Sequence, residues 1–329
     1  MTPLLAADPA AAFGQFLLIG LVSGLLYALI ALGYTMVYGI VELINFAHGD
    51  LFMLGCLLSL EVCLLVGART QAEAGTAAGV AAVALMLVAA PVFCAALNIA
   101  VDRAVYRPLR TAPKLAPLVS AIGVSFVFMG VGLFWKGATD VTFPDLLGPP
   151  IPPDAVNAAP PVPANLLEGT GLRFTFKDLM VVLVTIPTMA ALTVFVRYTT
   201  LGKAMRATAQ NPTAAQLMGI NVDRVIAATF AIGGALAGVG SVVYSLYFNT
   251  VNYQMGFQNG VYAFTAAVLG GIGNIPGAVL GGIVIGVVKT LGGAYIGSEW
   301  SEALIFAILV VILIFRPNGL LGARTREKV

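Results

Sequence analysis

The sequence predicts an all-α polytopic membrane protein with about eight or nine transmembrane helices, and three observations lead to this fold class. Apolar residues make up 59% of the 329 positions and charged residues only 10%, whereas about a quarter of the residues in soluble domains are charged. The run from Ala74 to Val101 contains no charge and exceeds the roughly 20 residues that a helix needs to cross a bilayer. The chain also contains 37 glycines, and glycine is common in membrane helices.

Nine apolar runs follow one another along the chain and predict nine crossings, give or take one. They lie near residues 13–39, 49–66, 76–101, 116–136, 179–196, 225–248, 257–272, 274–296 and 300–315. The first run is long and rich in glycine, and only a short glycine-rich string separates the seventh from the eighth. We therefore expect a broken or re-entrant helix among these three runs.

The basic residues predict the orientation, because short loops rich in lysine and arginine stay on the cytoplasmic side. Three segments hold most of them: Arg103, Arg107, Arg110 and Lys114; Arg197, Lys203, Arg206 and Arg224; and Arg316, Arg324, Arg326 and Lys328. With these segments inside, the crossings place the amino terminus outside and the carboxyl terminus inside.

Residues 137–178 are predicted to form a loop on the periplasmic side. Eight of the 18 prolines lie in this stretch, and proline favours extended or irregular chain over a folded domain. Its acidic residues outnumber its basic ones, which agrees with an outer position. We therefore expect residues 1–329 to form a single transmembrane domain.

The termini and the cysteines give no sign of secretion or of disulfides. Residues 1–15 lack the basic region of a secretory signal, so the first apolar run is expected to remain as a transmembrane segment. Cys56, Cys63 and Cys94 lie in apolar runs without a CxxC pair. They are predicted to be small buried hydrophobic residues rather than disulfides or metal ligands.

An enzyme is not expected. His48 is the only histidine, so an HExxH zinc site cannot form, and nothing in the sequence ties it to a serine nucleophile. The sequence contains no GxxxxGK[ST] loop, so any ATP energy must come from a partner. We expect no metal, no cofactor and, at a net charge of +2, no nucleic acid.

The first candidate site is the string INFAHGD at residues 44–50, preceded by Glu42. Polar groups near a bilayer are costly unless they face protein or water, so the string indicates a cavity or an interface loop. The alternative is a tight turn at the cytoplasmic edge. In that turn Glu42 and Asp50 are solvated and Asn45 caps the following helix.

The second candidate site is the string LGGIGNIPG at residues 269–277. Helices broken here would leave free backbone donors and acceptors at depth, a device by which transporters bind small polar solutes. The alternative is a glycine-rich packing face with a hairpin. In the run that follows, Lys289 is expected to snorkel outward rather than to pair with Glu299 or Glu302.

The third feature is the predicted cytoplasmic segment 197–224. Asn211 and Pro212 end one helix and begin a second, and Gly219 ends the second. A short apolar face is provided by Ala214, Ala215, Leu217 and Met218. The alternative is an interfacial linker that lies on lipid headgroups.

Four strings resemble one family. Residues 27–55, YALIALGYTMVYGIVELINFAHGDLFMLG, resemble the first signature of the LivH-type permeases of bacterial branched-chain amino acid ABC transporters. Residues 202–238 resemble the cytoplasmic coupling region of that family, residues 266–282 its second glycine-rich signature, and residues 315–322, FRPNGLLG, its closing string. The likeness covers nearly the whole chain and departs from the family in the proline-rich loop and at Glu42.

The resemblance implies a multi-pass permease subunit of an ABC importer in the bacterial inner membrane. It implies three kinds of protein partner: a homologous LivM-type permease, two ATP-binding subunits and a periplasmic substrate-binding protein. The implied ATPase coupling residues are Pro212, Ala214, Ala215, Leu217 and Gly219. The implied translocation path is lined or shaped by Asn45, His48, Gly49, Gly270, Gly271, Gly273, Asn274, Pro276 and Gly277.

Two other functions stay open. Permeases for urea or short amides carry very similar signatures, so the transported solute is not fixed by this subunit. An ion-coupled secondary carrier would need acidic residues at helix midpoints, and no acidic residue is clearly placed there by the pattern. The sequence also leaves open whether the pore is a heterodimer or a homodimer.

Overall fold

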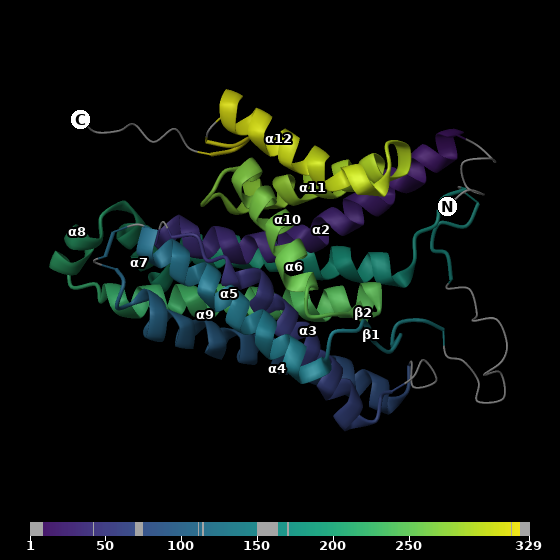
Figure 1. Cartoon of the computed structure of the whole chain (residues 1–329), viewed down its shortest axis with the longest axis horizontal. Coiled ribbons are helices and arrows are strands. Elements are labelled where there is room, and N and C mark those ends of the chain that lie inside the picture. Colours follow the sequence, from purple (N-terminus) through teal and green to yellow (C-terminus); the bar gives the residue numbers. More distant parts are fainter. Residues whose placement is uncertain are drawn as a thin grey trace.

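The computed structural model describes most of the chain as a bundle of helices. It covers residues 9–41, 43–69, 75–110, 112–113, 115–149, 164–169, 171–316 and 318–322. Figure 1 shows α8 at one end of the long axis and the first turns of α2 at the other. The end with α8 is termed the inner end here, and the opposite end the outer end.

The helices follow the predicted apolar runs. In chain order the elements are α2 (Pro9–Val41), α3 (Ala47–Val66), α4 (Ala77–Val101), η2 (Asp102–Tyr106), α5 (Leu115–Lys136), β1 (Val141–Thr142), α6 (Phe176–Tyr198), α7 (Thr200–Gln210), α8 (Pro212–Leu217), α9 (Val222–Phe248), β2 (Thr250–Val251), α10 (Met255–Gly270), α11 (Ile275–Tyr295), η4 (Ser298–Trp300) and α12 (Ser301–Phe315). The first predicted run is therefore one unbroken helix of 33 residues.

Within the described part of the chain, eight helices are long and apolar enough to cross a membrane, which agrees with the predicted eight or nine. The remaining predicted run is α10, a helix of only 16 residues. α10 follows β2, and its last turn accepts hydrogen bonds from the backbone of Leu320 and Leu321. The expected break in the helices lies just after it, at residues 271–274.

α2 is the most buried helix and packs closely against α11. A Cβ atom at Gly286 would lie 2.3 Å from the Cα of Gly24, so neither helix has room for a side chain at this crossing. Small residues allow such direct backbone contact between membrane helices. Near the inner end, Gly39 contacts Gly273 just before α11 begins, and α11 therefore runs antiparallel to α2.

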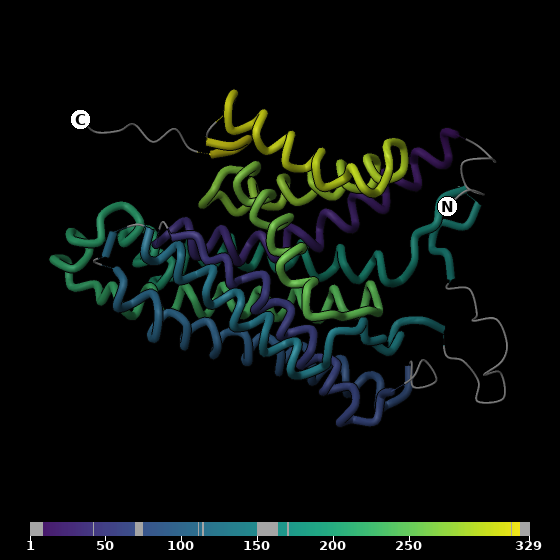
Figure 2. Tube along the Cα trace, viewed as in Figure 1, coloured from purple at the N-terminus to yellow at the C-terminus, as the bar shows by residue number. Residues whose placement is uncertain are grey.

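The peripheral helices carry the exposed apolar side chains. In the most apolar stretch of α12 only 11% of the residues are buried, against 78% in α2. Figure 2 shows α12 lying along the outside of α11. Large exposed side chains such as Phe134 on α5 and Phe315 on α12 are suited to lipid, which solvates apolar surface without cost.

Short elements close the outer end. β1 pairs antiparallel with β2, with Val141 opposite Val251, so the predicted loop 137–178 joins the connection between α9 and α10. α6 begins with a capping box of Thr175 and Asp178. Residues 150–163 and 170 of the loop lie outside the described residues.

Candidate functional site

The first predicted string returns into the bundle after α2 ends. α3 begins at Ala47, and the His48 ring lies against Gly33, where a Cβ atom would be 2.3 Å from Nε2 of His48. Gly33 lies eight residues before Val41, the end of α2, which is about 12 Å along a helix. α3 therefore starts inside the bundle. The prediction that falls on Glu42 lies outside the described residues.

Asn45 belongs to a buried network of amides and does not cap α3. Its Nδ2 donates to Oδ1 of Asn98 at 3.2 Å, and its Oδ1 accepts a hydrogen bond from the Tyr106 hydroxyl at 3.0 Å. Asn98 in turn donates to the backbone oxygen of Phe230 at 2.7 Å. The N-cap of α3 is Phe46, with no side-chain cap, so the capping alternative is wrong. The network joins the start of α3 to α4, η2 and α9.

His48 and Asp50 bring two further polar side chains into the interior, with exposed fractions of 1% and 0%. The His48 ring packs edge-on against Tyr34, with centroids 4.7 Å apart, and neither ring nitrogen has a hydrogen-bond partner of good geometry among the described residues. The Ser125 hydroxyl donates to Oδ2 of Asp50, while Oδ1 has no partner in that part of the chain. The expectation that Asp50 is solvated is therefore wrong. Because buried polar groups are nearly always paired, these atoms mark a candidate site.

Gly49 lies where α3 crosses α10. A Cβ atom at Gly49 would be 2.4 Å from the backbone oxygen of Gly256 and 2.6 Å from the Cα of Gly260. A Cβ atom at Gly256 would be 2.6 Å from Oδ1 of Asp50. The backbone of α10 therefore covers the side of α3 that carries Asp50, and only glycine fits on either helix.

The second predicted string forms the connection from α10 to α11. Gly271 and Gly273 have φ angles of 105° and 86°, a region that glycine adopts without strain. Asn274 caps α11, because its Oδ1 accepts the Gly277 N–H at 3.0 Å, and its Nδ2 donates to the backbone oxygen of Leu321 at 2.7 Å. The polar atoms of Asn274 are thus engaged in holding the connection together.

Gly270 and Pro276 complete this string. A Cβ atom at Gly270 would lie 1.9 Å from the backbone oxygen of Gly277, so α10 and α11 touch through their backbones. Pro276 occupies the first turn of α11, where its missing N–H leaves no helical hydrogen bond unmade. Pro276 also lines a cavity of about 340 Å³ together with Arg197 and Arg206.

The two strings face each other across a small apolar cavity of about 10 Å³. Its lining residues are Tyr34, Tyr38, Ile44, Asn45, Phe264, Ala267, Val268 and Ile272. A volume of this size holds about one water molecule. The space between Asn45 and the α10–α11 connection is therefore closed to any larger solute in this structure.

Lys289 turns into the bundle, so the prediction that it snorkels outward is wrong. Its Nζ donates to the Tyr27 hydroxyl at 2.8 Å and lies 4.1 Å from the centre of the Tyr262 ring. The Tyr262 hydroxyl donates to Glu302 at 2.9 Å. Aromatic faces attract cations, so the two tyrosines offset part of the cost of placing an ammonium group there. Lys289 reaches Glu302 through Tyr262 and not by a direct ion pair.

The inner end carries the short helix that the sequence predicts. α7 ends at Gln210, and Oδ1 of Asn211 caps α8 by accepting the Ala214 N–H at 2.9 Å. Pro212 is the first residue of α8. Gly219 follows the helix with a φ of 83°. The predicted start and stop signals therefore act as expected.

The exposed face of α8 differs from the predicted one at one position. Leu217 and Met218 are 85% and 83% exposed, whereas Ala215 is 4% exposed. Ala214, which is also exposed, lies three and four positions before them and so shares their face. Ala215 faces the interior of this chain, and a partner that meets α8 would contact Leu217 and Met218.

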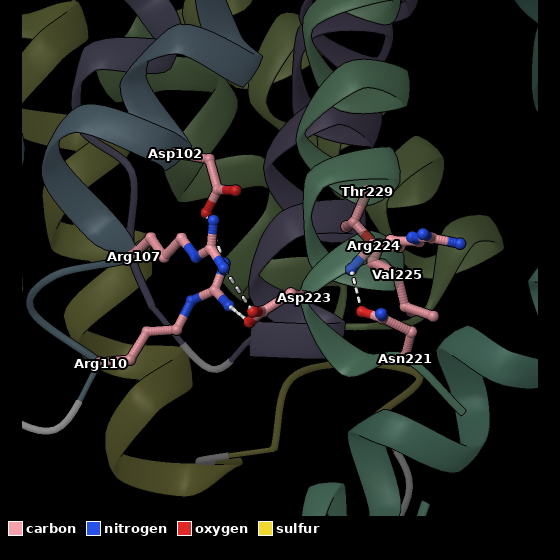
Figure 3. A network of polar contacts seen from close by, with 8 residues as sticks. All are labelled: Asp102, Arg107, Arg110, Asn221, Asp223, Arg224, Val225 and Thr229. Carbon is pink, nitrogen blue, oxygen red and sulfur yellow. Dashed lines mark hydrogen bonds and ion pairs between the residues drawn. The ribbon is translucent and has the colours of Figure 1, made fainter. Parts of the chain in front are cut away.

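Three ion pairs join the start of α9 to η2 and the residues that follow it, and the four residues involved, Asp102, Arg107, Arg110 and Asp223, are termed the charged clamp here. Figure 3 shows Arg107 and Arg110 pointing toward Asp223 in the first turn of α9. The two ion pairs measure 2.8 and 2.5 Å, and Arg110 also pairs with the buried Asp102 at 2.8 Å. Asn221 caps the same end of α9. The clamp therefore ties the connection after α8 to η2, the continuation of α4.

A larger cavity of about 980 Å³ lies beside the clamp. It is lined by the end of α2, the start of α5, α7, α8 and the start of α9. Tyr38 and Ile44 line both this cavity and the small one at Asn45. The two cavities are therefore adjacent, and Tyr38 and Ile44 lie between them.

The hydrogen-bond and ion-pair partners of the candidate site residues were not predicted from the sequence. Asn98 and Asp102 interrupt or end an apolar run, and polar residues at that depth are a usable signal. Ser125 gives no such signal, because serine is common in membrane helices. Arg107 and Arg110 served only to predict orientation, since ion pairs between segments far apart in the chain leave no local pattern.

The chain is similar over almost its whole length to permease components. A family model described as the branched-chain amino acid transport system permease component matches residues 16–313. The high-affinity branched-chain amino acid transport system permease protein LivH of Escherichia coli is 39% identical over 317 residues, which cover 96% of this chain and 98% of that protein. The corresponding protein BraD of Pseudomonas aeruginosa is 37% identical over 323 residues, with 96% and 97% covered.

A more distant relative comes from an archaeon. The probable branched-chain amino acid transport permease protein LivH of Methanocaldococcus jannaschii is 25% identical over 308 residues, which cover 90% of this chain and 89% of that protein. None of the solved structures matches this chain significantly. The fold described above therefore rests on this chain alone.

Proposed function

The chain belongs to the family of permease components of branched-chain amino acid transport systems, and from this premise we propose that it is the membrane-spanning subunit of an ABC importer for branched-chain amino acids. The observation that supports the proposal best is α8, a short exposed helix at the inner end that is joined through residues 218–221 to the membrane-spanning helix α9. ATP is hydrolysed on separate subunits, because the sequence contains no P-loop.

The face of α8 suits a protein partner. Leu217 and Met218 project from a helix that lies beyond the apolar crossings, and an exposed apolar patch on such an element marks an interaction site. Asn211 and Asn221 cap α8 and α9 and so fix the two helices on either side of the patch. When an ATP-binding subunit bound to this face moves, its displacement is transmitted directly to α9.

The charged clamp extends this transmission of movement from α9 into the membrane-spanning bundle. Asp223 moves with α9, and its ion pairs with Arg107 and Arg110 carry the movement to Asp102 at the start of η2. η2 also contains Tyr106, whose hydroxyl holds Asn45. The route therefore ends at the start of α3, beside the closed cavity.

The translocation path runs between the two strings that face this cavity. Asn45, His48 and Gly49 shape one side, and residues 270–277 shape the other. Opening the path requires α10 and α3 to separate, because a cavity of about 10 Å³ passes no amino acid.

The remaining proposed partners are a second permease subunit and a substrate-binding protein, since this chain supplies only part of an ABC importer. A homologous LivM-type permease completes the pore against the exposed apolar helices, and a periplasmic substrate-binding protein delivers the solute at the outer end. The complex lies in the bacterial inner membrane, with the amino terminus outside and α8 in the cytoplasm.

Uptake by the reconstituted complex tests the function. Proteoliposomes with all subunits and ATP inside should accumulate leucine, and accumulation should survive a protonophore. Urea and acetamide serve as competing solutes. Accumulation that follows an imposed ion gradient without ATP would mean a secondary carrier, and accumulation of urea in place of leucine would change the substrate class.

The partner surface is tested by substitutions on α8. The double variant Leu217→Ser, Met218→Ser should lose association with the ATP-binding subunit, because it removes the exposed apolar face. Phe315→Ser is a matched control, since that side chain is also exposed but lies on α12. Equal ATPase association in both variants would make α8 an interfacial linker.

The orientation is tested with single cysteines. Cys56, Cys63 and Cys94 are buried and free, as predicted, so the wild-type chain gives little background with a membrane-impermeant thiol reagent. Leu166→Cys should react from outside the cell and Leu217→Cys only after the membrane is opened. The reverse pattern would invert the proposed topology.

A further inference from the structure

Asp50 places a carboxyl group with one unpaired oxygen inside the membrane-spanning bundle. The side chain lies in the first turn of α3 and is completely buried. Ser125 donates one hydrogen bond to Oδ2, and no described residue pairs with Oδ1. Ionisable residues at membrane depth are costly and are kept where they serve a function.

The surroundings of Asp50 lack a cation. Within the described chain, none of the five ion pairs involves Asp50. Among the described residues, Ser125 of α5 donates a hydrogen bond to it, and a hydroxyl group carries no fixed positive charge. Oδ1 of Asp50 can therefore accept a hydrogen bond from a further donor.

α10 covers this oxygen with bare backbone. A Cβ atom at Gly256 would lie 2.6 Å from Oδ1 of Asp50, and a Cβ atom at Gly260 would lie 2.9 Å from the Cα of Gly49. The cover is a short helix that ends at Gly270, and Gly271 and Gly273, which have positive φ angles, lie in the connection to α11. At Gly256 the part of α10 that lies against Asp50 is backbone without a side chain.

We propose that Asp50 binds the ammonium group of the transported amino acid and that α10 is the cover that must move to admit it. This inference rests on the proposed function and adds the group that recognises the solute within the membrane. An ammonium group supplies three N–H donors and one positive charge, which match the unpaired oxygen of Asp50 and the charge that its carboxyl group carries once it has lost its proton.

Removal of the carboxylate charge is the first test. In the reconstituted complex, Asp50→Asn should lower ATP-driven leucine uptake about tenfold or more, the size expected for a lost charged hydrogen bond, without loss of subunit association. Ser125→Ala is the matched control, because it removes the neighbouring hydroxyl but keeps the carboxylate, and it should lower uptake less. Normal uptake by Asp50→Asn would overturn the inference and leave the proposed function intact. Absence of ATP-driven uptake by the wild type would instead reject the proposed function.

Chemical labelling is the second test and does not measure transport. Dicyclohexylcarbodiimide is apolar and modifies protonated carboxyl groups inside membranes, and mass spectrometry of peptides locates the label. Asp50 should label slowly in the resting complex, faster during ATP turnover with the unloaded binding protein, and slowly again when that protein carries leucine. A labelling rate that is equal under all three conditions would overturn the inference. Protection by sodium ions without leucine would also overturn it, because the site would then hold an inorganic cation.

The cover is tested separately. Gly256→Ala places a methyl group against Asp50 and should push α10 away, so that Asp50 labels faster in the resting complex. Gly123→Ala on α5 is the matched control, because no atom lies within 4 Å of its added Cβ, and its labelling should equal that of the wild type. An unchanged rate in a folded Gly256→Ala variant would remove α10 as the cover. If that variant does not fold, the Asp50→Asn and protection experiments still decide the assignment of Asp50.

Discussion

Residues 45–50 and residues 270–277 both interrupt the apolar pattern, yet they contribute different things to the molecule. The first string brings side chains into the interior, where Asn45, His48 and Asp50 are all buried. The second brings backbone into contact with backbone: Gly270 touches Gly277, and Gly273 touches Gly39. The first string is therefore distinguished by its buried polar atoms, and the second by its close contacts between backbones.

This difference predicts opposite sensitivities. The polar positions of the first string, Asn45, His48 and Asp50, should be sensitive to deletion of a polar group, whereas Gly49 in the same string has no room for a Cβ atom. The second string should be damaged by the addition of a single methyl group, whatever its polarity. Three substitutions test this contrast, and they follow in decreasing order of the expected loss of stability.

The largest effect is expected for Gly270→Ala. Its Cβ atom would lie 1.9 Å from the backbone oxygen of Gly277, and a backbone atom within two packed helices cannot move aside. Overpacking typically costs about 1–3 kcal/mol, and this contact should reach the upper end of that range. The thermal midpoint of the purified protein in detergent measures the loss. Gly130→Ala, with no atom within 4 Å of the added Cβ, should unfold at the wild-type temperature.

An intermediate effect is expected for Asn98→Ala in the network of the first string. The change leaves Nδ2 of Asn45 without a partner and removes the side-chain hydrogen bond to the backbone oxygen of Phe230, which keeps its bond within α9. Each buried unpaired group costs about 1–3 kcal/mol in soluble proteins, and hydrogen bonds between membrane helices average about 0.6 kcal/mol. We expect a loss near 1–2 kcal/mol in the same measurement. Tyr106→Phe, which removes one hydroxyl, should cost less, and an equal cost would mean that Asn98 contributes no more than one bond.

The smallest effect is expected for Asn274→Ala, the one residue of the second string that acts through its side chain. Loss of an N-cap costs about 1 kcal/mol, and the bond to Leu321 is at the exposed inner surface. Asn274→Ser keeps a capping oxygen and should restore part of the stability. A loss larger than that of Gly270→Ala would contradict the assignment of this string to backbone packing.

The helices of this chain could be predicted from sequence with good accuracy, because lipid selects for long apolar runs independently of the rest of the fold. The run predicted at 76–101 is α4 at 77–101, and the run at 49–66 is α3 at 47–66. The start and stop signals of α8 are equally local, since a cap, a proline and a glycine act within a few residues.

The partners in the candidate site could not be predicted, because they join segments far apart in the chain. Asn45 meets Asn98, Asp223 meets Arg110, and Lys289 meets Tyr27, and no local pattern links the members of these pairs. The sequence left the position of Asp50 open between a solvated turn and a buried site for a related reason. A carboxylate at a helix start is typical of a surface, and only the return of the chain to the level of Gly33 places it at depth.

The backbone contact of Gly24 with Gly286 can form only late in the synthesis of the chain. α2 leaves the ribosome first among the described helices, whereas its tightest neighbour α11 is made near the end of synthesis. At about 5–20 residues per second, the glycine face of α2 waits on the order of ten seconds or more before α11 exists. During that interval lipid, a neighbouring helix or the insertion machinery must occupy the groove, and truncated chains that stop before Gly286 never close it.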